Sequence, residues 1–328
     1  MTAKPYTFIN DLTNVEDFAP VRGTPWLITS GTTRESKDPP YVKGGVQHNR
    51  ATIRGGLRVI DRRDKSFKRV WPENGRPIRR DPRFNDCAEP TSAETFSCSG
   101  LHLAHGKNGM HTLYAVNRTE RDSIEIFEVK EEPAGLAFTW IGAILLPYPC
   151  VGNSVTVLPD GSVVVTAMYM SNDNWADKIK TKEDTGYVVR WRPSVGWSKV
   201  PGSEGCIPNG IVSSPDGSML YINYSGTGTS IAKPIDGDKS TRKVIELGFM
   251  PDNVRWGDDG NLWIGGVRQI GNPYPKICKI SLATLKPEFI EIPDQAEPFN
   301  HCSVAIKIES EIWLGAFSCT CVAVLPAQ

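Results

Sequence analysis

The sequence lacks the features that mark several large classes of protein. No apolar run approaches the roughly 20 residues of a membrane-spanning helix, and the N-terminus MTAKPYTFIND has no basic stretch followed by an apolar core. Neither sign of charge is in excess, because 37 Lys and Arg residues balance 37 Asp and Glu residues. No strong field would therefore attract a nucleic acid or an anionic membrane. We expect a soluble, cytoplasmic protein with neither as a partner.

Several catalytic signatures are also missing. There is no G-x-S-x-G elbow, no P-loop and no dinucleotide fingerprint, so we do not expect a serine hydrolase of that type, a kinase or a nicotinamide enzyme. The eight cysteines form no C-x-x-C pair, and in a reducing cytosol they are expected to be small buried side chains. No long segment has helical periodicity, which leaves β-structure as the expected framework.

A segment that recurs six times dominates what is present. Each copy holds a polar residue, a short apolar run, a turn and a second apolar run, which is typical of a β-hairpin. The clearest copies read NSVTVLPDGSVVVTA from Asn153, NGIVSSPDGSMLYIN from Asn209 and DNVRWGDDGNLWIGG from Asp252, and the others begin at Glu16, Ser99 and His301. Hairpins spaced by several tens of residues indicate a radial repeat. We therefore predict an all-β, six-bladed β-propeller.

The two ends of the sequence are predicted to share the sixth blade. Only one strand, Cys321 to Leu325, follows the last hairpin, and the N-terminal run Tyr6 to Ile9 can supply the missing one. Such closure removes open sheet edges at which aggregation could start. We predict a single propeller domain over residues 1–328. It contains a long insertion at about residues 32–95, part of which, LRVIDRRDKSFKRV, is predicted to form outer strands of the first blade. The remainder is either a solvated loop or a lid or dimer contact.

Polar residues open the inner strands of four predicted blades at equivalent positions. They are Glu16, Asn153, Asn209 and the pair Asp252 and Asn253. Inner strands line the central channel, so these side-chain oxygens would converge on its axis, as the ligands of a hard cation do. Zinc or copper would require His or Cys here. The pattern predicts Ca²⁺, with Mg²⁺ or Mn²⁺ less favoured, unless these residues only turn the backbone before each strand.

The motifs around these positions resemble a known group of enzymes. The runs NVEDFAPVRGTPWLITSG, LPYPCVGNSVTVLPDGS, PNGIVSSPDGSMLYI and PDNVRWGDDGNLWIGG are similar to those of the paraoxonase and arylesterase lactonases. These belong with the gluconolactonase (senescence-marker-protein) and strictosidine-synthase-like calcium propellers. The resemblance implies that the five residues above bind a catalytic calcium, and that Asp17 matches a ligand of a second, structural calcium. Paraoxonases have Asp where this sequence has Ser154, which departs from that second site.

The catalytic base of the paraoxonases cannot be transferred to this sequence. Where they have a pair of His residues, this chain has Ser99 and Arg118. Three candidates for the base remain. His102 and His301 could face the channel, although each could equally be structural. Asp252 could attack or move a proton while bound to the metal.

Four residues are predicted to line a substrate pocket at the mouth of the channel. Ser99 and Arg118 stand at the positions of the missing imidazoles, and Met168 and Tyr224, just beyond inner hairpins, could supply an apolar wall. Core packing is the alternative role for Met168 and Tyr224.

These features favour a calcium-dependent hydrolase of a lactone or ester that acts on a small molecule. The ion would polarise the carbonyl, and water or a carboxylate would attack it. A metal-templated lyase, isomerase or condensing enzyme is the alternative, because both imidazoles are absent. A binding propeller without catalysis is the third possibility. The identity of the substrate and the oligomeric state do not follow from the sequence.

Overall fold

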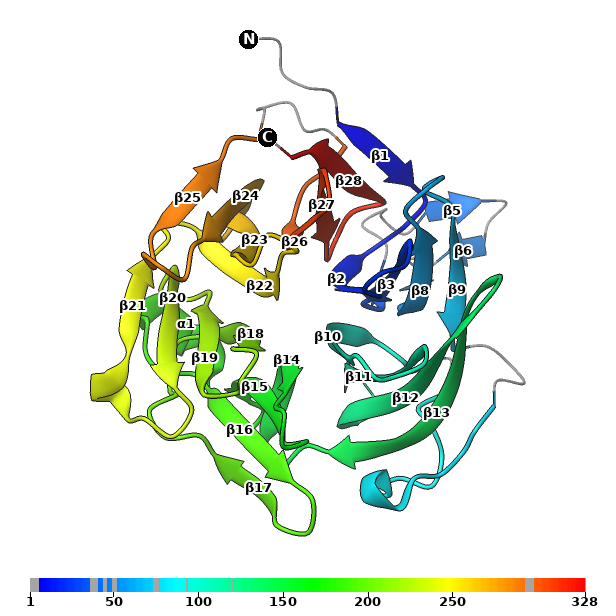
Figure 1. Ribbon diagram of the computed structural model, residues 1–328. Helices are drawn as coiled ribbons and strands as arrows, with labels where there is room; N and C mark the ends of the chain where they lie inside the picture. The colour runs from blue at the N-terminus through cyan, green and yellow to red at the C-terminus, as the bar shows by residue number, and fades with distance from the viewer. Residues whose placement is uncertain are drawn as a thin grey trace.

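Each of the six predicted hairpins forms the two innermost strands of an antiparallel sheet, and the six sheets stand in a ring (Figure 1). The computed structural model describes residues 6–35, 41–43, 46–48, 52–72, 77–92, 94–119, 121–292 and 298–327. Each of the six sheets has four strands. The chain is therefore a six-bladed β-propeller, as predicted from the repeat.

Blades one to three follow one another along the chain, and the first strand of each is innermost. Blade one contains β2 (Val15–Pro20), β3 (Trp26–Gly31), β8 (Gly56–Asp61) and β9 (Phe67–Trp71). Blade two contains β10 (Cys98–Ala104), β11 (Met110–Arg118), β12 (Asp122–Glu132) and β13 (Gly135–Leu145). Blade three contains β14 (Cys150–Val157), β15 (Val163–Met170), β16 (Tyr187–Arg192) and β17 (Gly196–Lys199).

Blades four and five repeat this order, and blade six closes the ring. Blade four contains β18 (Pro208–Ser213), β19 (Met219–Tyr224), β20 (Thr229–Pro234) and β21 (Lys243–Glu246). Blade five contains β22 (Met250–Trp256), β23 (Leu262–Gln269), β24 (Asn272–Ile280) and β25 (Pro287–Ile290). Blade six contains β26 (Cys302–Ile308), β27 (Glu311–Ala316), β28 (Cys321–Pro326) and β1 (Thr7–Asn10).

The predicted closure by the two ends of the chain is confirmed. Strand β1 pairs antiparallel with β28, with Thr7 opposite Val324 and Asn10 opposite Cys321. In Figure 1 the blue β1 lies along the red β28 at the outer side of blade six. One strand from the start of the chain therefore completes a sheet that the end of the chain leaves one strand short.

Apolar side chains fill the space between neighbouring blades. Each of the six buried clusters combines residues from two adjacent sheets, so the packing runs around the ring. Between blades six and one, Phe18 and Trp313 meet edge to face with ring centroids 6.5 Å apart, and Ile9 of β1 belongs to the same cluster. Burial of this surface is the main term that holds the blades at a fixed angle to one another.

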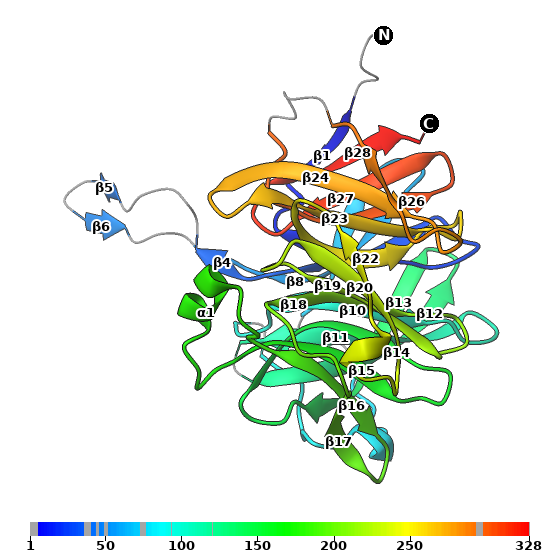
Figure 2. The ribbon, with the colours of Figure 1, turned by 90° about the vertical axis from the view of Figure 1, so that its left-hand side faces the viewer.

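The predicted insertion at residues 32–95 contains regular structure. As predicted, it supplies the outer strands β8 and β9 of blade one. It also forms two short strand pairs, β4 (Arg34–Glu35) with β7 (Thr52–Ile53) and β5 (Tyr41–Lys43) with β6 (Val46–His48). Figure 2 shows β4, β5 and β6 projecting on the same side of the propeller as α1 (Trp175–Thr181). The inner strands begin at this same face of the propeller, since Cys150, the first residue of β14, pairs with Met170 just before α1.

The end of the insertion covers the outer edge of blade two. Around the 3-10 helix η1 (Pro82–Phe84), Ile78 and Asn85 form parallel bridges with Trp140 and Ala143 of β13. A Cβ at Gly142, where φ is +150°, would lie 2.0 Å from the carbonyl oxygen of Phe84, so the close approach requires glycine. The segment thus pairs backbone groups that an open sheet edge would expose.

Helical structure is sparse. Besides α1 and η1, the described part of the chain has a single further helical turn, η2 (Lys239–Thr241). None of its helices has the length and apolar character needed to span a bilayer.

Shortening Ile9 tests how much the closing strand contributes to stability. Ile9 is 5% exposed in β1, whereas the neighbouring Thr7 is exposed. Ile9→Ala should lower the free energy of unfolding by about 2–5 kcal/mol, because it leaves a cavity between blades six and one. The control Thr7→Ala should change it by less than about 0.5 kcal/mol. Equal effects in urea denaturation would show that β1 does not hold the ring closed.

Candidate metal centre at the hub

Every innermost strand breaks register with its neighbour at an equivalent place. In five blades two consecutive residues have no partner in the ladder: Glu16 and Asp17, Ser99 and Gly100, Asn153 and Ser154, Asn209 and Gly210, and Asp252 and Asn253. In blade six the break leaves only Ser303 unpaired. Such β-bulges turn side chains away from the regular pleat. All five predicted metal ligands are among these unpaired residues.

We call the five predicted metal ligands among them, Glu16, Asn153, Asn209, Asp252 and Asn253, the hub ring. The inner strands β2, β10, β14, β18, β22 and β26 each contact the next one around the channel, which brings residues far apart in sequence together. Asn153 donates its side-chain N–H to Oδ1 of Asn209, and Nδ2 of Asn209 donates to Oγ of Ser225 at 3.0 Å. Nδ2 of Asn253 donates to the main-chain oxygen of Glu16 at 3.0 Å. The amides are thereby held in fixed positions around the axis.

Two buried carboxyl groups of the hub ring, those of Glu16 and Asp252, lie close enough to interact. Burial raises the pKa of Asp252 well above its usual range, and the negative charge of Glu16 raises it further, while the Asn209 side chain opposes the shift. Glu16 is only 5% exposed. Two buried like charges are costly unless a positive charge lies between them.

The donor set of the hub ring fits a hard cation. Oδ1 of Asp252 and Oδ1 of Asn253 are buried, and neither accepts a hydrogen bond from any described residue. Carboxylate and amide oxygens are the ligands that calcium takes, whereas zinc prefers nitrogen and sulfur. Within the described ranges, no group of three or more His, Cys, Asp or Glu is placed to hold a metal. The ring has only two carboxylates, and its other donors are neutral amides, so its chemistry matches calcium. Metal binding itself stays a prediction.

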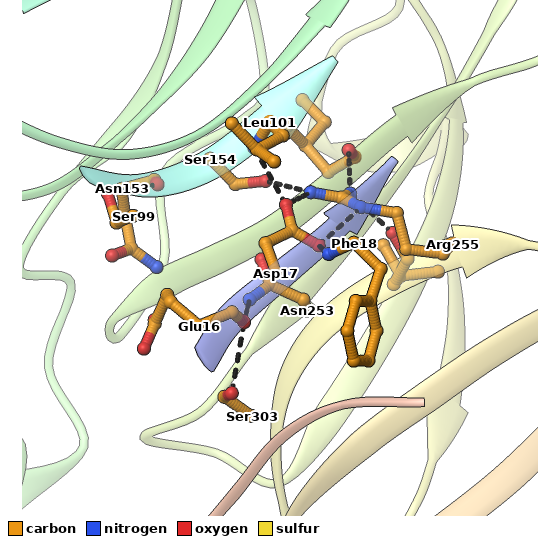
Figure 3. A network of polar contacts seen from close by, with 12 residues as sticks. Glu16, Asp17, Phe18, Ser99, Leu101, Asn153, Ser154, Asn253, Arg255 and Ser303 are labelled. Atoms are coloured by element: carbon orange, nitrogen blue, oxygen red, sulfur yellow. Dashed lines mark hydrogen bonds and ion pairs between the residues drawn. The ribbon is translucent and has the colours of Figure 1, made fainter. Parts of the chain in front are cut away.

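A second tier of polar contacts lies directly beside the ring (Figure 3). Asp17 is fully buried and forms a two-pronged ion pair with Arg255, whose Nε donates to Oδ1 at 2.8 Å and whose Nη2 donates to Oδ2. Oδ2 also accepts from the main-chain N–H of Leu101 at 2.7 Å. Nη2 of Arg255 reaches Oγ of Ser154 at 3.4 Å. A guanidinium group therefore contacts both Asp17 and Ser154.

The resemblance to paraoxonases implies a second calcium at Asp17, and these contacts do not fit one. Both oxygens of Asp17 are already bound by the Arg255 guanidinium. Nη1 of the same group donates to the carbonyl oxygens of Val254 and Ile211, at 2.6 Å and 3.3 Å. The oxygens that could surround a cation thus surround a permanent positive charge instead.

Ser99 and Arg118, the predicted pocket residues of blade two, both contact Asn153. The buried Ser99 donates through Oγ to the main-chain oxygen of Asn153 at 2.8 Å. Nη1 of the half-buried Arg118 donates to the side-chain Oδ1 of Asn153 at 2.9 Å. The structure therefore brings both residues to the hub ring.

His102 lies further along β10 than the hub ring. Its ring meets that of Tyr114, with centroids 6.4 Å apart. Burial lowers its pKa to about 3, helped by the charges of Arg255, His105 and Arg22. Arg22 stands in the turn after β2, at the opposite end of that strand from Glu16. None of these contacts of His102 is with a predicted ligand.

His301 precedes β26 at the hub end of blade six. Its φ of +55° places it in the left-handed region, its Nδ1 bonds Oδ1 of Asn300 at 2.5 Å, and its ring meets Phe317 at a centroid distance of 5.3 Å. The hydroxyl of Ser303, two residues on, donates to the main-chain oxygen of Glu16 at 2.9 Å. A catalytic role for either histidine stays a prediction.

The two residues predicted as an apolar wall have different surroundings. Tyr224 is 3% exposed, and its hydroxyl donates to the main-chain oxygen of Ser203 at 2.9 Å, so it packs within the sheets rather than at the hub ring. Met168 is partly buried near the end of β15, where its main-chain oxygen accepts from Thr185 at 2.9 Å.

Sequence reasoning missed Arg255, which organises the second tier. The signal for it was present, because Arg255 follows Asn253 by two residues in an alternating strand and so points to the same side. A charged residue at that inward position requires a buried counter-charge. The sequence pattern does not show which residue supplies that counter-charge, and the structure shows that it is Asp17.

Breaking the buried pair should destabilise the protein strongly. Asp17→Leu leaves the guanidinium of Arg255 buried without its counter-charge, so the free energy of unfolding should fall by about 3–5 kcal/mol. The double variant Asp17→Leu/Arg255→Met should recover most of this loss. The control Asp177→Ala, which removes an exposed ion pair with Lys180, should cost less than about 1 kcal/mol. A loss in Asp17→Leu as small as in the control would contradict a structural role for the pair.

His102 should make the protein sensitive to acid. Its pKa is about 3 in the folded protein against 6.5 for an ordinary His. Between these two pH values the unfolded chain binds a proton at His102 and the folded protein does not. The stability contributed by neutral His102 is present above pH 6.5 and is lost as the pH falls toward 3, at up to about 1.4 kcal/mol per pH unit. Urea denaturation below pH 6.5 should show a shallower decline for His102→Asn than for wild type. Parallel declines would mean that His102 is freely protonated in the folded state.

Comparisons with known proteins agree with the architecture. Residues 149–272 match the family model described as SMP-30/gluconolactonase/LRE-like region. No curated protein matches the chain by sequence.

Similar solved structures include luciferin-regenerating enzyme, with 12% identity, a TM-score of 0.57 and coverage of 98% of this chain and 95% of that one. A gluconolactonase from Xanthomonas campestris has 15% identity, a TM-score of 0.56 and coverage of 98% and 89%. A virginiamycin B lyase from Staphylococcus aureus has 12% identity, a TM-score of 0.55 and coverage of 99% of both chains. At these identities the likeness shows the fold alone.

The matched segment contains four of the five predicted ligands, Asn153, Asn209, Asp252 and Asn253. Residues 149–272 of this six-bladed propeller are therefore similar to the SMP-30/gluconolactonase/LRE-like region, which confirms the predicted resemblance to the gluconolactonase group of propellers.

Proposed function

We propose that this protein hydrolyses a lactone or ester with a calcium ion bound in the hub ring. The observation that carries the proposal is the convergence of oxygen donors from four blades, Glu16, Asn153, Asn209 and Asp252, at positions where the ladder is interrupted. The SMP-30/gluconolactonase/LRE-like match across residues 149–272 supports lactones as the substrate class.

The hub ring combines charged and neutral candidate ligands. Glu16 and Asp252 would supply the negative charge that holds a divalent cation, and Asn153 and Asn209 would add amide oxygens in fixed orientations. A bound calcium ion would polarise the substrate carbonyl and stabilise the oxyanion that forms on attack. Burial of these residues strengthens each electrostatic contact, because little water is present to screen it.

Asp252 is the proposed general base. Its Oδ1 accepts no hydrogen bond from the described residues, so it is open to a proton from an attacking water molecule. The water oxygen would form a bond to the carbonyl carbon while its proton passes to Asp252. As the C–O bond to the leaving oxygen breaks, Asp252 would return that proton to it. A lactone would thus open to a hydroxy acid.

We prefer Asp252 to the two histidines because of their contacts. The ring of His102 meets Tyr114, and the charges that act on it are those of Arg255, His105 and Arg22, none of which is a predicted ligand. The ring of His301 packs on Phe317. Asp252 is the one candidate base that lies in the hub ring itself.

A lyase or isomerase reaction at the same hub is the second candidate. The observation that favours it is that the described hub ring contains no imidazole. Asp252 would then take a proton from carbon rather than from water. Mass spectrometry separates the two reactions, since hydrolysis adds one water to the substrate and elimination does not.

Removing the charge of Asp252 tests the proposal. Asp252→Asn should raise the Kd for calcium about tenfold or more in isothermal titration calorimetry, because a divalent cation loses one of its two carboxylate ligands. It should also abolish turnover on a panel of lactones and aryl esters that wild type hydrolyses in the presence of calcium. The matched control is Asp236→Asn, which replaces an exposed Asp and should leave both quantities unchanged.

Two results would contradict this function. Wild-type protein that binds no calcium would remove the metal from the mechanism. Wild-type protein that binds calcium tightly but opens no member of the panel would leave the hub as a structural ion site.

A further inference from the structure

Arg118 places a positive charge beside the hub ring. It is the last residue of β11, and its Nη1 donates to Oδ1 of Asn153 at 2.9 Å. Its charge also acts on Asp252. A guanidinium group therefore borders the site that we propose for calcium.

Most of the hydrogen-bonding capacity of Arg118 is unused. Its side chain donates to Asn153 and to no other described residue, and its remaining nitrogens are not among the buried unpaired atoms. They are open to solvent, because the side chain is only partly buried. A guanidinium has five donors in a planar fork, so one face of that fork is available to a ligand.

No described carboxylate forms an ion pair with Arg118. Asp122 lies opposite it across the β11–β12 hairpin, and Asp252 lies across the ring; both feel its charge without forming an ion pair with it. By contrast, Arg255 in the second tier is fully engaged by Asp17. The two hub arginines thus differ: one is satisfied within the protein and the other is not.

A positive charge next to a cation site weakens binding of the cation. That cost is offset if an anion binds between the two positive charges. The planar fork of Arg matches the two oxygens of a carboxylate. Asn153 could still bind the cation, because its amide oxygen has a second lone pair besides the one that accepts from Arg118.

We propose that Arg118 is a specificity-determining residue that binds a carboxylate on the substrate. The substrate class is then a lactone or ester that carries a carboxylate near its scissile carbonyl. This inference rests on the proposed function. It adds that an anionic substrate is preferred over a neutral one of the same shape.

A pair of matched compounds tests the inference. The anionic compound is 5-oxotetrahydrofuran-2-carboxylate, and the neutral one is its 2-carboxamide, which has nearly the same shape. Wild type loaded with calcium should show a kcat/KM about 10- to 100-fold higher for the carboxylate. Arg118→Gln should abolish most of this preference, and Arg118→Lys should retain part of it, because Lys keeps the charge without the fork. The control Arg63→Gln, at an exposed Arg in blade one, should keep the wild-type preference.

Calorimetry gives two readouts that do not depend on turnover. The carboxylate should bind wild type at least about tenfold more tightly than it binds Arg118→Gln. Calcium alone should bind Arg118→Gln as tightly as wild type or more tightly, since a neighbouring positive charge has been removed. Loss of calcium binding in Arg118→Gln would overturn the inference, because it would show that Arg118 serves only to position Asn153.

The remaining outcomes separate this inference from the proposed function. If wild type binds the carboxylate in preference to the amide and hydrolyses neither, the role of Arg118 stands and the hydrolase assignment fails. If wild type hydrolyses both equally, the hydrolase assignment stands and the inference about Arg118 fails. If Arg118→Gln alters only the free energy of unfolding, Arg118 balances Asp122 and has no role in specificity.

Discussion

The ion pair between Asp17 and Arg255 is the contact on which the geometry of the hub depends. It joins β2 of blade one to β22 of blade five. The pair also forms hydrogen bonds with Leu101 of blade two, Ser154 of blade three and Ile211 of blade four. Each partner is buried, so neither can relax into water. Because Glu16 and Asn253 are chain neighbours of this pair, the two-pronged contact also sets where the predicted metal ligands stand.

The hub separates its charges into two tiers. In one tier the negative charge of Asp17 is cancelled within the protein by Arg255. In the other, Glu16 and Asp252 remain close together, with no comparable partner for Oδ1 of Asp252. This division leaves oxygen donors for the one predicted cation and none for a second cation at Asp17.

Much of this fold could be predicted from the sequence because it rests on local signals. Period-two apolar runs split by a turn identify the six hairpins, and counting strands in the last repeat predicts the pairing of β1 with β28. The register of the repeat also predicts which residues share the hub ring. The resemblance of the motifs to calcium propellers then indicated which chemistry those residues would perform.

What could not be predicted depends on contacts between distant blades. The alternating pattern of β22 does not distinguish Arg255 from other residues of the strand. Only the three-dimensional structure shows that Asp17 is its ion-pair partner. Tyr224 follows an inner hairpin, yet its ring direction is decided by packing against the loop that contains Ser203. No apolar repeat in the sequence predicts the two short strand pairs, β4 with β7 and β5 with β6. For Arg255 and Tyr224 the deciding partner lies outside the local pattern.

The register breaks of the inner strands have a consequence for how tolerant this architecture is. A residue that has no place in the ladder can be exchanged without removing any of the backbone bonds that hold its blade together. Apart from Asp17, which is paired with Arg255, and the closely packed Gly100 and Gly210, the residues at these breaks are thus largely independent of the framework. Protein design could therefore replace the side chains at the axis one blade at a time and keep the strands that hold them unchanged.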